Sequence, residues 1–335
     1  MNRVVIVTIN WNGAEDTADC VASLCSLNYD DFHVVVVDNA STAKDTRKSL
    51  SKLVSDQVTV IYNKENLGFS GGVNTGIRYA MEHGYDYVAL FNNDAVANKN
   101  WLKELVKSAE KEQSGITTGL LLHRDGETID STGDWCSNWG LPFPRNRGDK
   151  TIEAAVSGPV FSGSGGASLY SVKMFKDMGL FDEKFFMYYE DTDISFRAQN
   201  YGYKVYYTDQ AIAYHKQGAS SDKVSGLGVR QAFRNLPTFY IKNMPTKLLW
   251  LTGPRFALAY ILMLGNAVKR GDAKPALSGW LAGIPLFWLH ALPARFKIQG
   301  KRKVSSDYIR SILWPDLPPD QTGLRKFRSA FTGKS

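Results

Sequence analysis

Three carboxylates gather within four residues of this chain, at Glu190, Asp191 and Asp193, directly after a run of large apolar side chains. Acids are favoured in the first turn of a helix, so solvated carboxylates at a helix N-terminus are one interpretation. The preceding residues, 185–189, read FFMYY and predict a partly desolvated pocket beside the acids. Because burial raises the pKa of a carboxyl group, such a pocket suits a general base.

Four predicted strands precede these acids, and each is followed by a polar cluster. The first, Arg3–Ile9, reads RVVIVTI, a continuous β-branched run typical of a strand buried on both faces. Strand, loop and helix then repeat, which predicts an α/β fold with a parallel sheet. Ligands bind beyond the carboxyl ends of such strands, so we expect one shared cleft. The other strands are expected at 32–37, 58–62 and 87–91, the helices at 15–27 and up to residue 81, and the clusters at 10–13, 38–41, 66–76 and 92–94.

Each cluster offers a different chemistry. Asp38, at a strand end, suits acceptance of the imide N–H of uracil or thymine, and Thr8 and Asn10 offer contacts to the same base and ribose. Asp94 closes an Asn-Asn-Asp turn where a divalent cation could bridge protein and diphosphate, and a simple Asx turn is the alternative. Glycines at 68, 71, 72 and 76 present amides at a helix N-terminus to anionic groups. Their spacing matches neither GxGxxG nor a P-loop.

Later segments add to the expected site. The helix that begins at the acids is expected to turn Arg197 outward. A predicted strand and turn at 206–214 lead to His215, which alone would more often be structural but beside Asp94 could stabilise a diphosphate. Residues 162–166 read SGSGG, where small side chains either let an acceptor approach closely or form a flexible loop.

These segments resemble, in order and spacing, glycosyltransferase family 2. The resemblance spans about residues 1–218 and is nearest to the bacterial rhamnosyltransferases. It implies a GT-A fold with a Rossmann-like, mostly parallel sheet, inversion at the transferred sugar, and Mg²⁺ or Mn²⁺ as cofactor. The motifs that carry it are VTINWNG (7–13), VDNAS (37–41), NLGFSGGVNTGIRYA (66–80), FNNDA (91–95), FFMYYEDTDISFRAQNYGYKV (185–205) and AYH (213–215).

The resemblance also implies roles for single residues. Asp191 resembles the family's catalytic base, and Asp94 resembles its metal-binding acid. His215 resembles a histidine that completes the metal or diphosphate site in some relatives, and Asp38 resembles the base-binding acid. The implied contacts to the donor nucleotide are Thr8, Asn10, Asn12, Asp38, Asn39, Gly68, Phe69, Gly72, Asn74 and Asn93.

The chain departs from the family pattern in two places. The metal motif is Asn92-Asn93-Asp94 rather than Asp-x-Asp, so few protein ligands are expected on the metal. The Gln-x-x-Arg-Trp motif of processive synthases is missing, because residues 231–235 read QAFRN. A processive polymerase is therefore not expected.

Composition bounds the class of protein. The chain has 335 residues, of which 44% are hydrophobic, enough for one sizeable domain with an appendage. Its three cysteines, Cys20, Cys25 and Cys136, suggest no disulfide framework, and an odd thiol fits a reducing compartment. The N-terminus starts directly with a strand, so we expect no signal peptide.

The net charge of +7 conceals two opposite halves, which we expect to be a catalytic domain at 1–222 and a membrane-associating region at 223–335. The second half carries 19 Lys or Arg against four Asp, a net charge of +15, and the first half is at −8. Two apolar stretches, 248–268 and 275–294, are bracketed by Lys and Arg. We expect helices that lie in a membrane interface and contact an anionic surface. A transmembrane span and a soluble helical bundle are the alternatives.

The residues and the resemblance together predict an inverting glycosyltransferase, peripheral on the cytoplasmic face of the cell membrane. Its expected donor is dTDP-rhamnose and its acceptor a lipid-linked saccharide, with UDP-linked hexoses, including galactofuranose, as alternative donors. A nucleotide-sugar-binding regulator without catalysis is a further alternative, against which the retention of Asp94, Asp191 and His215 argues. Nucleic acid is not an expected partner, because the basic residues bracket apolar runs rather than alternate with aromatics on a polar surface.

Overall fold

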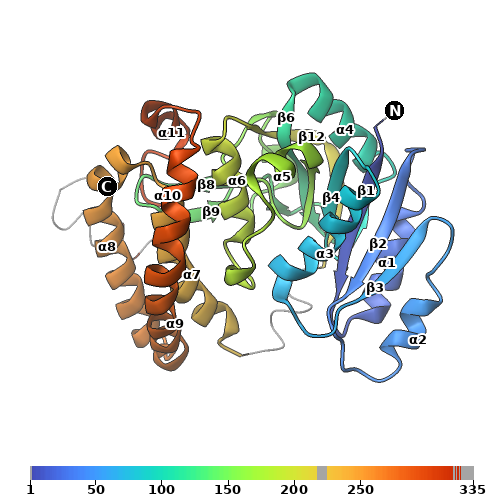
Figure 1. Ribbon diagram of the computed structural model, residues 1–335, viewed down its shortest axis with the longest axis horizontal. Helices are drawn as coiled ribbons and strands as arrows, with labels where there is room; N and C mark the ends of the chain where they lie inside the picture. The colour runs from blue at the N-terminus through green and yellow to red at the C-terminus, as the bar shows by residue number, and fades with distance from the viewer. Residues whose placement is uncertain (1, 217–224, 320, 322, 324, 326–335) are drawn as a thin grey trace.

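The computed structural model describes residues 2–216, 225–319, 321, 323 and 325. A mixed sheet with helices on its faces lies at one end of the molecule, and the C-terminal helices lie at the other (Figure 1). The predicted α/β fold with a C-terminal helical extension is therefore confirmed.

The N-terminal half of the sheet is parallel, in the order β4-β1-β2-β3. Strand β1 pairs with β2 in register, and Asn10 lies opposite Asp38 at the carboxyl ends. The four strands predicted from the sequence are confirmed to within one residue at each end. They are β1 Val4–Asn10, β2 Phe32–Asp38, β3 Val58–Tyr62 and β4 Tyr87–Phe91.

The other half of the sheet runs in both directions. Strand β11 lies antiparallel between β4 and β6, and β12 lies parallel to β6 on its far side. The segment expected as a strand and turn at 206–214 is part of one long strand, β12, with a register shift between Tyr207 and Ile212. These strands are β5 Ala95–Ala97, β6 Ser114–His123, β7 Ile129–Ser131, β10 Gly158–Pro159, β11 Ala167–Ser171 and β12 Lys204–His215, beside a separate hairpin of β8 Asp134–Cys136 and β9 Pro142–Pro144.

Helices cover both faces of the sheet and bury two apolar cores. Successive residues of β1 alternate between them, with Val4 and Ile6 in one core and Val5 and Val7 in the other. This alternation is what a strand buried on both faces requires. The helices of this half are α1 Ala14–Leu24, α2 Thr46–Ser51, α3 Gly68–Glu82, α4 Trp101–Glu112, α5 Val172–Met178 and α6 Glu190–Asn200, with 3₁₀ turns η1 Thr151–Glu153 and η2 Glu183–Phe185.

The C-terminal helices share a third core with the sheet half. Phe196 of α6 packs 5.9 Å from Phe239 of α7, ring centroid to ring centroid, and Phe185 belongs to the same core. The expected domain boundary between 222 and 223 falls in the segment 217–224, outside the described residues. The elements are α7 Leu227–Asn243, α8 Thr246–Lys269, α9 Ala273–Leu286, a π-helical turn η4 Phe287–Ala291, α10 Leu292–Gly300 and α11 Ser306–Ile312.

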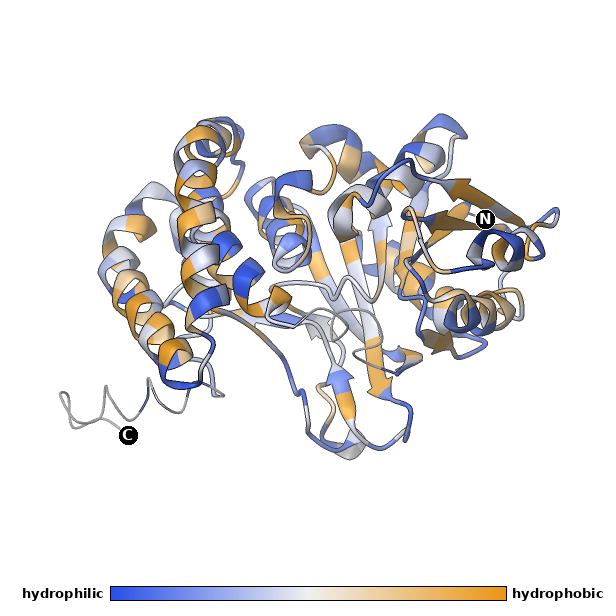
Figure 2. Cartoon of the chain, turned by 90° about the horizontal axis from the view of Figure 1, so that it is seen from below, coloured by the Kyte–Doolittle hydropathy of each residue, from blue (hydrophilic) through white to orange (hydrophobic). Residues whose placement is uncertain are grey.

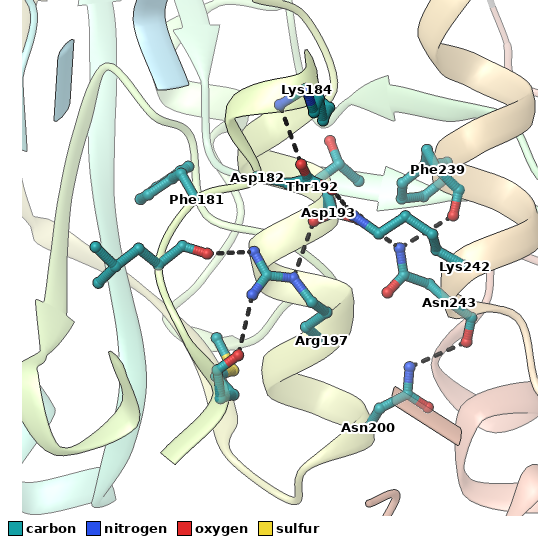
Figure 3. A network of polar contacts seen from close by, with 12 residues as sticks. Phe181, Asp182, Lys184, Thr192, Asp193, Arg197, Asn200, Phe239, Lys242 and Asn243 are labelled. Carbon is teal, nitrogen blue, oxygen red and sulfur yellow. Dashed lines mark hydrogen bonds and ion pairs between the residues drawn. The ribbon is translucent and has the colours of Figure 1, made fainter. Parts of the chain in front are cut away.

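A buried ion-pair network joins α7 to α6 (Figure 3). Lys242 of α7 contacts the carboxylates of Asp182 and Asp193, and its Nζ lies 3.0 Å from Asp193 Oδ1. Arg197 Nε donates to Asp193 Oδ2 at 2.9 Å, and the guanidinium also donates to two backbone carbonyls. The expectation that Arg197 faces outward is wrong, because its charge is neutralised one helical turn back and its donors are satisfied inside.

Candidate active site

A pocket of about 430 Å³ lies at the carboxyl ends of the parallel strands. All four polar clusters predicted to share a cleft contribute to its wall, so the shared cleft is confirmed. The residues from these clusters are Trp11, Asn39, Asn66, Gly68, Phe69, Val73, Asn92, Asn93 and Asp94, and later elements contribute Gly165, Phe186, Met187, His215 and Leu227.

His215, at the end of β12, lies between two carboxylates. Its Nε2 is 2.9 Å from Asp94 Oδ1, and its Nδ1 is 2.8 Å from Asp130 Oδ2. Asp130 in turn lies 3.4 Å from Arg147 Nε. Burial would lower the pKa of His215, but the hydrogen bonds to Asp130 and Asp94 outweigh it and raise that pKa to about 9. The structure thus brings the two predicted metal ligands, Asp94 and His215, into direct contact.

The donor atoms of Asp94 and His215 fit a divalent cation, which would displace the proton of His215 Nε2. Two ligand atoms held at about 2.1 Å on one octahedral ion are about 3 Å apart, close to the spacing of Asp94 Oδ1 and His215 Nε2. The contact from His215 Nδ1 to Asp130 is the carboxylate support that metal-bound histidines commonly have. Within the part of the chain that the structure describes, no three His, Cys, Asp or Glu side chains form a metal-binding group. Two protein ligands suit an ion that takes its other ligands from phosphate and water.

Asp191 lies in the first turn of α6, next to the pocket wall. Its Oδ2 accepts from the Gly165 amide at 3.2 Å, and its Oδ1 accepts from the Thr192 amide at 2.7 Å. Burial raises the pKa of Asp191, although these hydrogen bonds oppose the shift. Glu190 and Asp193 are buried, whereas Asp191 is only partly buried. Of the three acids, Asp191 therefore has the exposure and the pKa direction that suit a general base.

Asp38 lies beside a second hollow, between the end of β2 and α2. Its Oδ1 accepts from Asn10 Nδ2 at 2.7 Å and from Ser41 Oγ at 2.6 Å. The same hollow is lined by Tyr62 and by Arg47, whose guanidinium carbon lies 4.4 Å from the centre of the Tyr62 ring. Such a hollow suits a nucleotide: the carboxylate can accept a hydrogen bond from the base, the aromatic ring can stack on it, and a cation can bind the phosphates.

The glycine-rich segment forms the start of α3. Gly68 has φ +68°, and a Cβ there would lie 2.3 Å from the Phe186 carbonyl oxygen. A Cβ at Gly76 would lie 2.4 Å from Val7, and one at Gly72 would lie 2.9 Å from Ile9. Gly72 and Gly76 let α3 approach the sheet closely, and Gly68 lets its start approach Phe186. The sequence did not separate this packing role from anion binding.

Several predicted nucleotide contacts are engaged elsewhere. Asn74 is buried, and its amide accepts from the Phe181 amide and donates to the Phe181 carbonyl. Thr8 is fully buried beneath the strand end. Asn10 and Asn12 hold neighbouring loops through their side-chain oxygens. The structure does not bring the side chains of Thr8 and Asn74 to the pocket, because buried polar groups there are satisfied by the fold itself.

Residues 185–189, which we call the aromatic loop, have an unusual backbone. Phe186, Tyr188 and Tyr189 have φ of 65°, 70° and 71°. Phe186 and Met187 line the pocket as predicted, whereas Phe185 is fully buried and Tyr189 stacks on α7. Positive φ at bulky residues has no sequence signal, so this backbone could not be predicted from the sequence.

Asp130 is the main site residue that the sequence analysis missed. It lies on β7, 85 residues before His215 in the chain, and the pairing of β7 with β6 places it behind the imidazole. No motif surrounds it, so only the fold identifies it.

Residues 4–179 match the family model described as glycosyl transferase family 2, and the chain belongs to this family. It is 26% identical over 245 residues to the low-salt glycan biosynthesis hexosyltransferase of Haloferax volcanii, which covers 70% of this chain and 74% of that protein. It is 27% identical over 229 residues to the dTDP-rhamnosyl transferase RfbF of Shigella flexneri, covering 67% of this chain and 72% of the relative. The protein is thus a glycosyltransferase, as the sequence motifs predicted.

Solved structures share the fold. A mannosyltransferase of Pyrobaculum calidifontis, in complex with GDP-Man and Mn²⁺, has a TM-score of 0.55 at 16% identity, over 93% of this chain and 83% of that one. A structure of TarS 1-349 from S. aureus has a TM-score of 0.54 at 15% identity, over 89% of each chain. At these identities the likeness concerns the fold, and it confirms the predicted α/β architecture.

Proposed function

We propose that the protein is an inverting, metal-dependent hexosyltransferase that moves a sugar from a nucleoside-diphosphate donor to an acceptor hydroxyl in polysaccharide synthesis. The observation that carries this proposal is the convergence of two groups on one pocket. Asp94 and His215 lie in its wall, and Asp191 adjoins the same wall through Gly165.

The chemistry divides between these groups. Asp191 takes the proton of the acceptor hydroxyl while that oxygen attacks the anomeric carbon from the face opposite the diphosphate. The new glycosidic bond forms as the bond to the diphosphate breaks, so the configuration inverts. Asp94 and His215 would hold Mg²⁺ or Mn²⁺, whose charge stabilises the leaving diphosphate. Asp130 keeps the imidazole of His215 oriented toward Asp94.

For the donor we propose dTDP-rhamnose. The support is the likeness to a dTDP-rhamnosyl transferase and the Asp38 carboxylate, which can accept the imide N–H of thymine. Uracil offers the same N–H, so UDP-hexoses and UDP-galactofuranose are the competing donors. A panel of nucleoside diphosphates and their sugars, screened by thermal shift with and without Mn²⁺, separates these possibilities.

The transfer proposal is tested by Asp191→Asn, with Glu190→Gln as the matched neighbour. Nucleoside-diphosphate release with acceptor present should fall at least ~10²-fold in Asp191→Asn, while donor binding persists. Near-normal turnover in Asp191→Asn, or a larger loss in Glu190→Gln, would contradict the assignment. Donor binding by the native protein without any turnover would favour the regulator.

We further propose that α8 and α9 dock the enzyme on the cytoplasmic face of a membrane, where a lipid-linked saccharide presents its acceptor hydroxyl. Among the described residues, Thr246–Lys269 and Ala273–Gly300 are long and apolar enough to cross a membrane, by length and composition only. Only 17% and 22% of the two apolar windows are buried, and Figure 2 shows hydrophobic stretches along these helices.

The exposed apolar residues follow helical spacing. On α9 and η4 five of them recur at i, i+3, i+4, i+7 and i+11, which makes one stripe, and Leu289 lies beside it at i+12. On the neighbouring α8, Trp250 is 80% exposed. Exposed Lys and Arg flank both helices, which suits anionic lipid. The stripe consists of Leu277, Trp280, Leu281, Ile284 and Trp288.

Vesicle flotation tests this docking face. Replacing Trp250 and Trp288 by Ser should weaken binding to anionic vesicles roughly 10³-fold, since each buried Trp contributes about 2 kcal/mol. Val156→Ser is the matched control, because Val156 is 82% exposed on the sheet half. Native protein that stays unbound at low salt but dimerises through these tryptophans would contradict the membrane proposal.

A further inference from the structure

One side chain of α7, Asn235, makes most of the hydrogen bonds from that helix to the aromatic loop. Asn235 Nδ2 lies 2.9 Å from the carbonyl oxygens of Phe185 and Met187 and 3.0 Å from that of Tyr188. Arg234 Nη1 lies 2.9 Å from Asn235 Oδ1 and so fixes which way the amide points. Asn235 is fully buried, and it is the residue at which segment 231–235 departs from Gln-x-x-Arg-Trp.

The loop needs such a partner for two physical reasons. Left-handed backbone at bulky residues is unfavourable and persists only where the surroundings over-determine it. The same turn directs three carbonyl oxygens inward, where each requires a donor. The Met187 amide and Arg234 Nη1 also donate to the Phe185 carbonyl, so the two amide hydrogens of Asn235 can serve the carbonyls of Met187 and Tyr188 from one point. A hydrocarbon side chain could not do this.

The aromatic loop contacts both the pocket wall and the helix that carries Asp191. Phe186 and Met187 line the pocket, and the Phe186 carbonyl accepts from the Ser70 amide at 3.1 Å, in the first turn of α3. Asp191 follows the loop by two residues, in the helix that the loop begins. A displacement of the loop therefore moves the general base and one wall of the pocket together.

We propose that Asn235 is a positioning residue for sugar transfer: it fixes the aromatic loop and thereby the placement of Asp191. This inference rests on the proposed function. It gives α7 an indirect part in the reaction, because Asn235 acts through the aromatic loop and does not need to contact the substrate. Misplacement of a reacting group by about 1 Å can cost about 10²-fold in rate.

The test compares Asn235→Asp with Asn200→Asp. Both residues are fully buried, and Asn200 Nδ2 donates to a carbonyl, that of Asn243, at the far end of α6. In Asn235→Asp, kcat should fall about 10²-fold, whereas the dissociation constant of the donor nucleoside diphosphate should change less than about threefold. Asn200→Asp should lose stability but keep kcat within about threefold. Equal losses of kcat in the two variants, or full kcat in Asn235→Asp, would overturn the proposal.

Hydrogen exchange gives a readout that is independent of turnover. Amides of residues 185–191 should exchange faster in Asn235→Asp than in the native protein, and those of β1 should not. Unchanged exchange in the loop would overturn the clamp even if the transfer proposal held. If the native protein transfers no sugar, faster loop exchange still shows the clamp while the proposed function fails. If Asn235→Asp does not fold, Asn235→Ser serves the same comparison, with a smaller expected loss because its hydroxyl retains one donor.

Discussion

Replacing Lys242 by Met tests how firmly the C-terminal helices are joined to the sheet half. Lys242 is 2% exposed, and Met matches its length without its charge. The change leaves the carboxylates of Asp182 and Asp193 buried without this cation. Breaking a buried ion pair costs about 3–5 kcal/mol. Because Asp182 keeps His290 Nε2 at 2.7 Å and Asp193 keeps Arg197, we expect the lower value, about 3 kcal/mol.

The effect should depend on pH. Burial would raise the pKa of Asp182, but Lys242 and His290 outweigh it and hold that pKa well below its usual range. A depressed carboxyl pKa stabilises the folded state above the unfolded pKa, and this contribution is lost as pH falls through the folded pKa. The difference in unfolding free energy between the native protein and Lys242→Met should therefore be largest at pH 7 and should decrease below about pH 4.

Urea unfolding followed by circular dichroism measures this difference. Lys247→Met is the matched control, because the Lys247–Asp307 pair, 3.3 Å apart, is exposed on both sides. Its loss should cost less than about 1 kcal/mol. Adding Asp182→Asn to Lys242→Met should recover part of the stability, since it removes a buried charge that has lost its lysine partner. A loss below about 1 kcal/mol in Lys242→Met, or no recovery in the double variant, would refute the reasoning.

Three further outcomes are expected. EDTA should inactivate transfer and Mn²⁺ or Mg²⁺ should restore it, with Asp94→Ala weakening donor binding; full activity in EDTA would contradict the metal proposal. Asp38→Ala should weaken dTDP binding roughly tenfold in calorimetric titration, since one charge-assisted hydrogen bond is lost; unchanged affinity would remove Asp38 from the base site. Gly279→Ala should lower the unfolding free energy by about 1–3 kcal/mol, because its Cβ would lie 2.1 Å from the Arg230 carbonyl oxygen. Gly265→Ala, with open space around it, should instead gain about 0.5–1 kcal/mol.

The parallel strands and their ligand edge were predictable because their signals are local. A β-branched run such as Val4–Ile9 specifies burial on both faces, and a polar cluster after each strand specifies the edge. Asp94 and His215 were predicted to meet, and they do so because β12 pairs with β5 directly after β4. The sequence showed both residues, but only the pairing of strands brings them within 2.9 Å.

The rest depended on contacts between distant segments. Asp193 belongs to the same acidic cluster as Asp191, yet it is bound to Lys242, 49 residues later, and sequence spacing cannot reveal such a partner. Arg197 was predicted to face outward because charged residues usually contact solvent. It is buried because it pairs with Asp193, which also contacts Lys242. Thr8 and Asn74 show the converse case, since motif position suggested a ligand contact and the structure shows that both side chains are buried in the fold.

The position of α7 has a consequence for how this protein can be recombined. Leu227 at its start lines the pocket, and its middle and end are joined to the aromatic loop and to α6. The charge pattern suggests that the chain after residue 222 is an exchangeable tail. A junction placed before α7 would, however, also replace Leu227 and Asn235, which contact the pocket and the aromatic loop. A chimaera that keeps native α7, Gly279 and His290 and exchanges only exposed residues of α8 and α9 should retain sugar transfer. The exposed residues of α8 and α9 can in this sense diverge without altering the pocket, whereas α7 and the aromatic loop must change together.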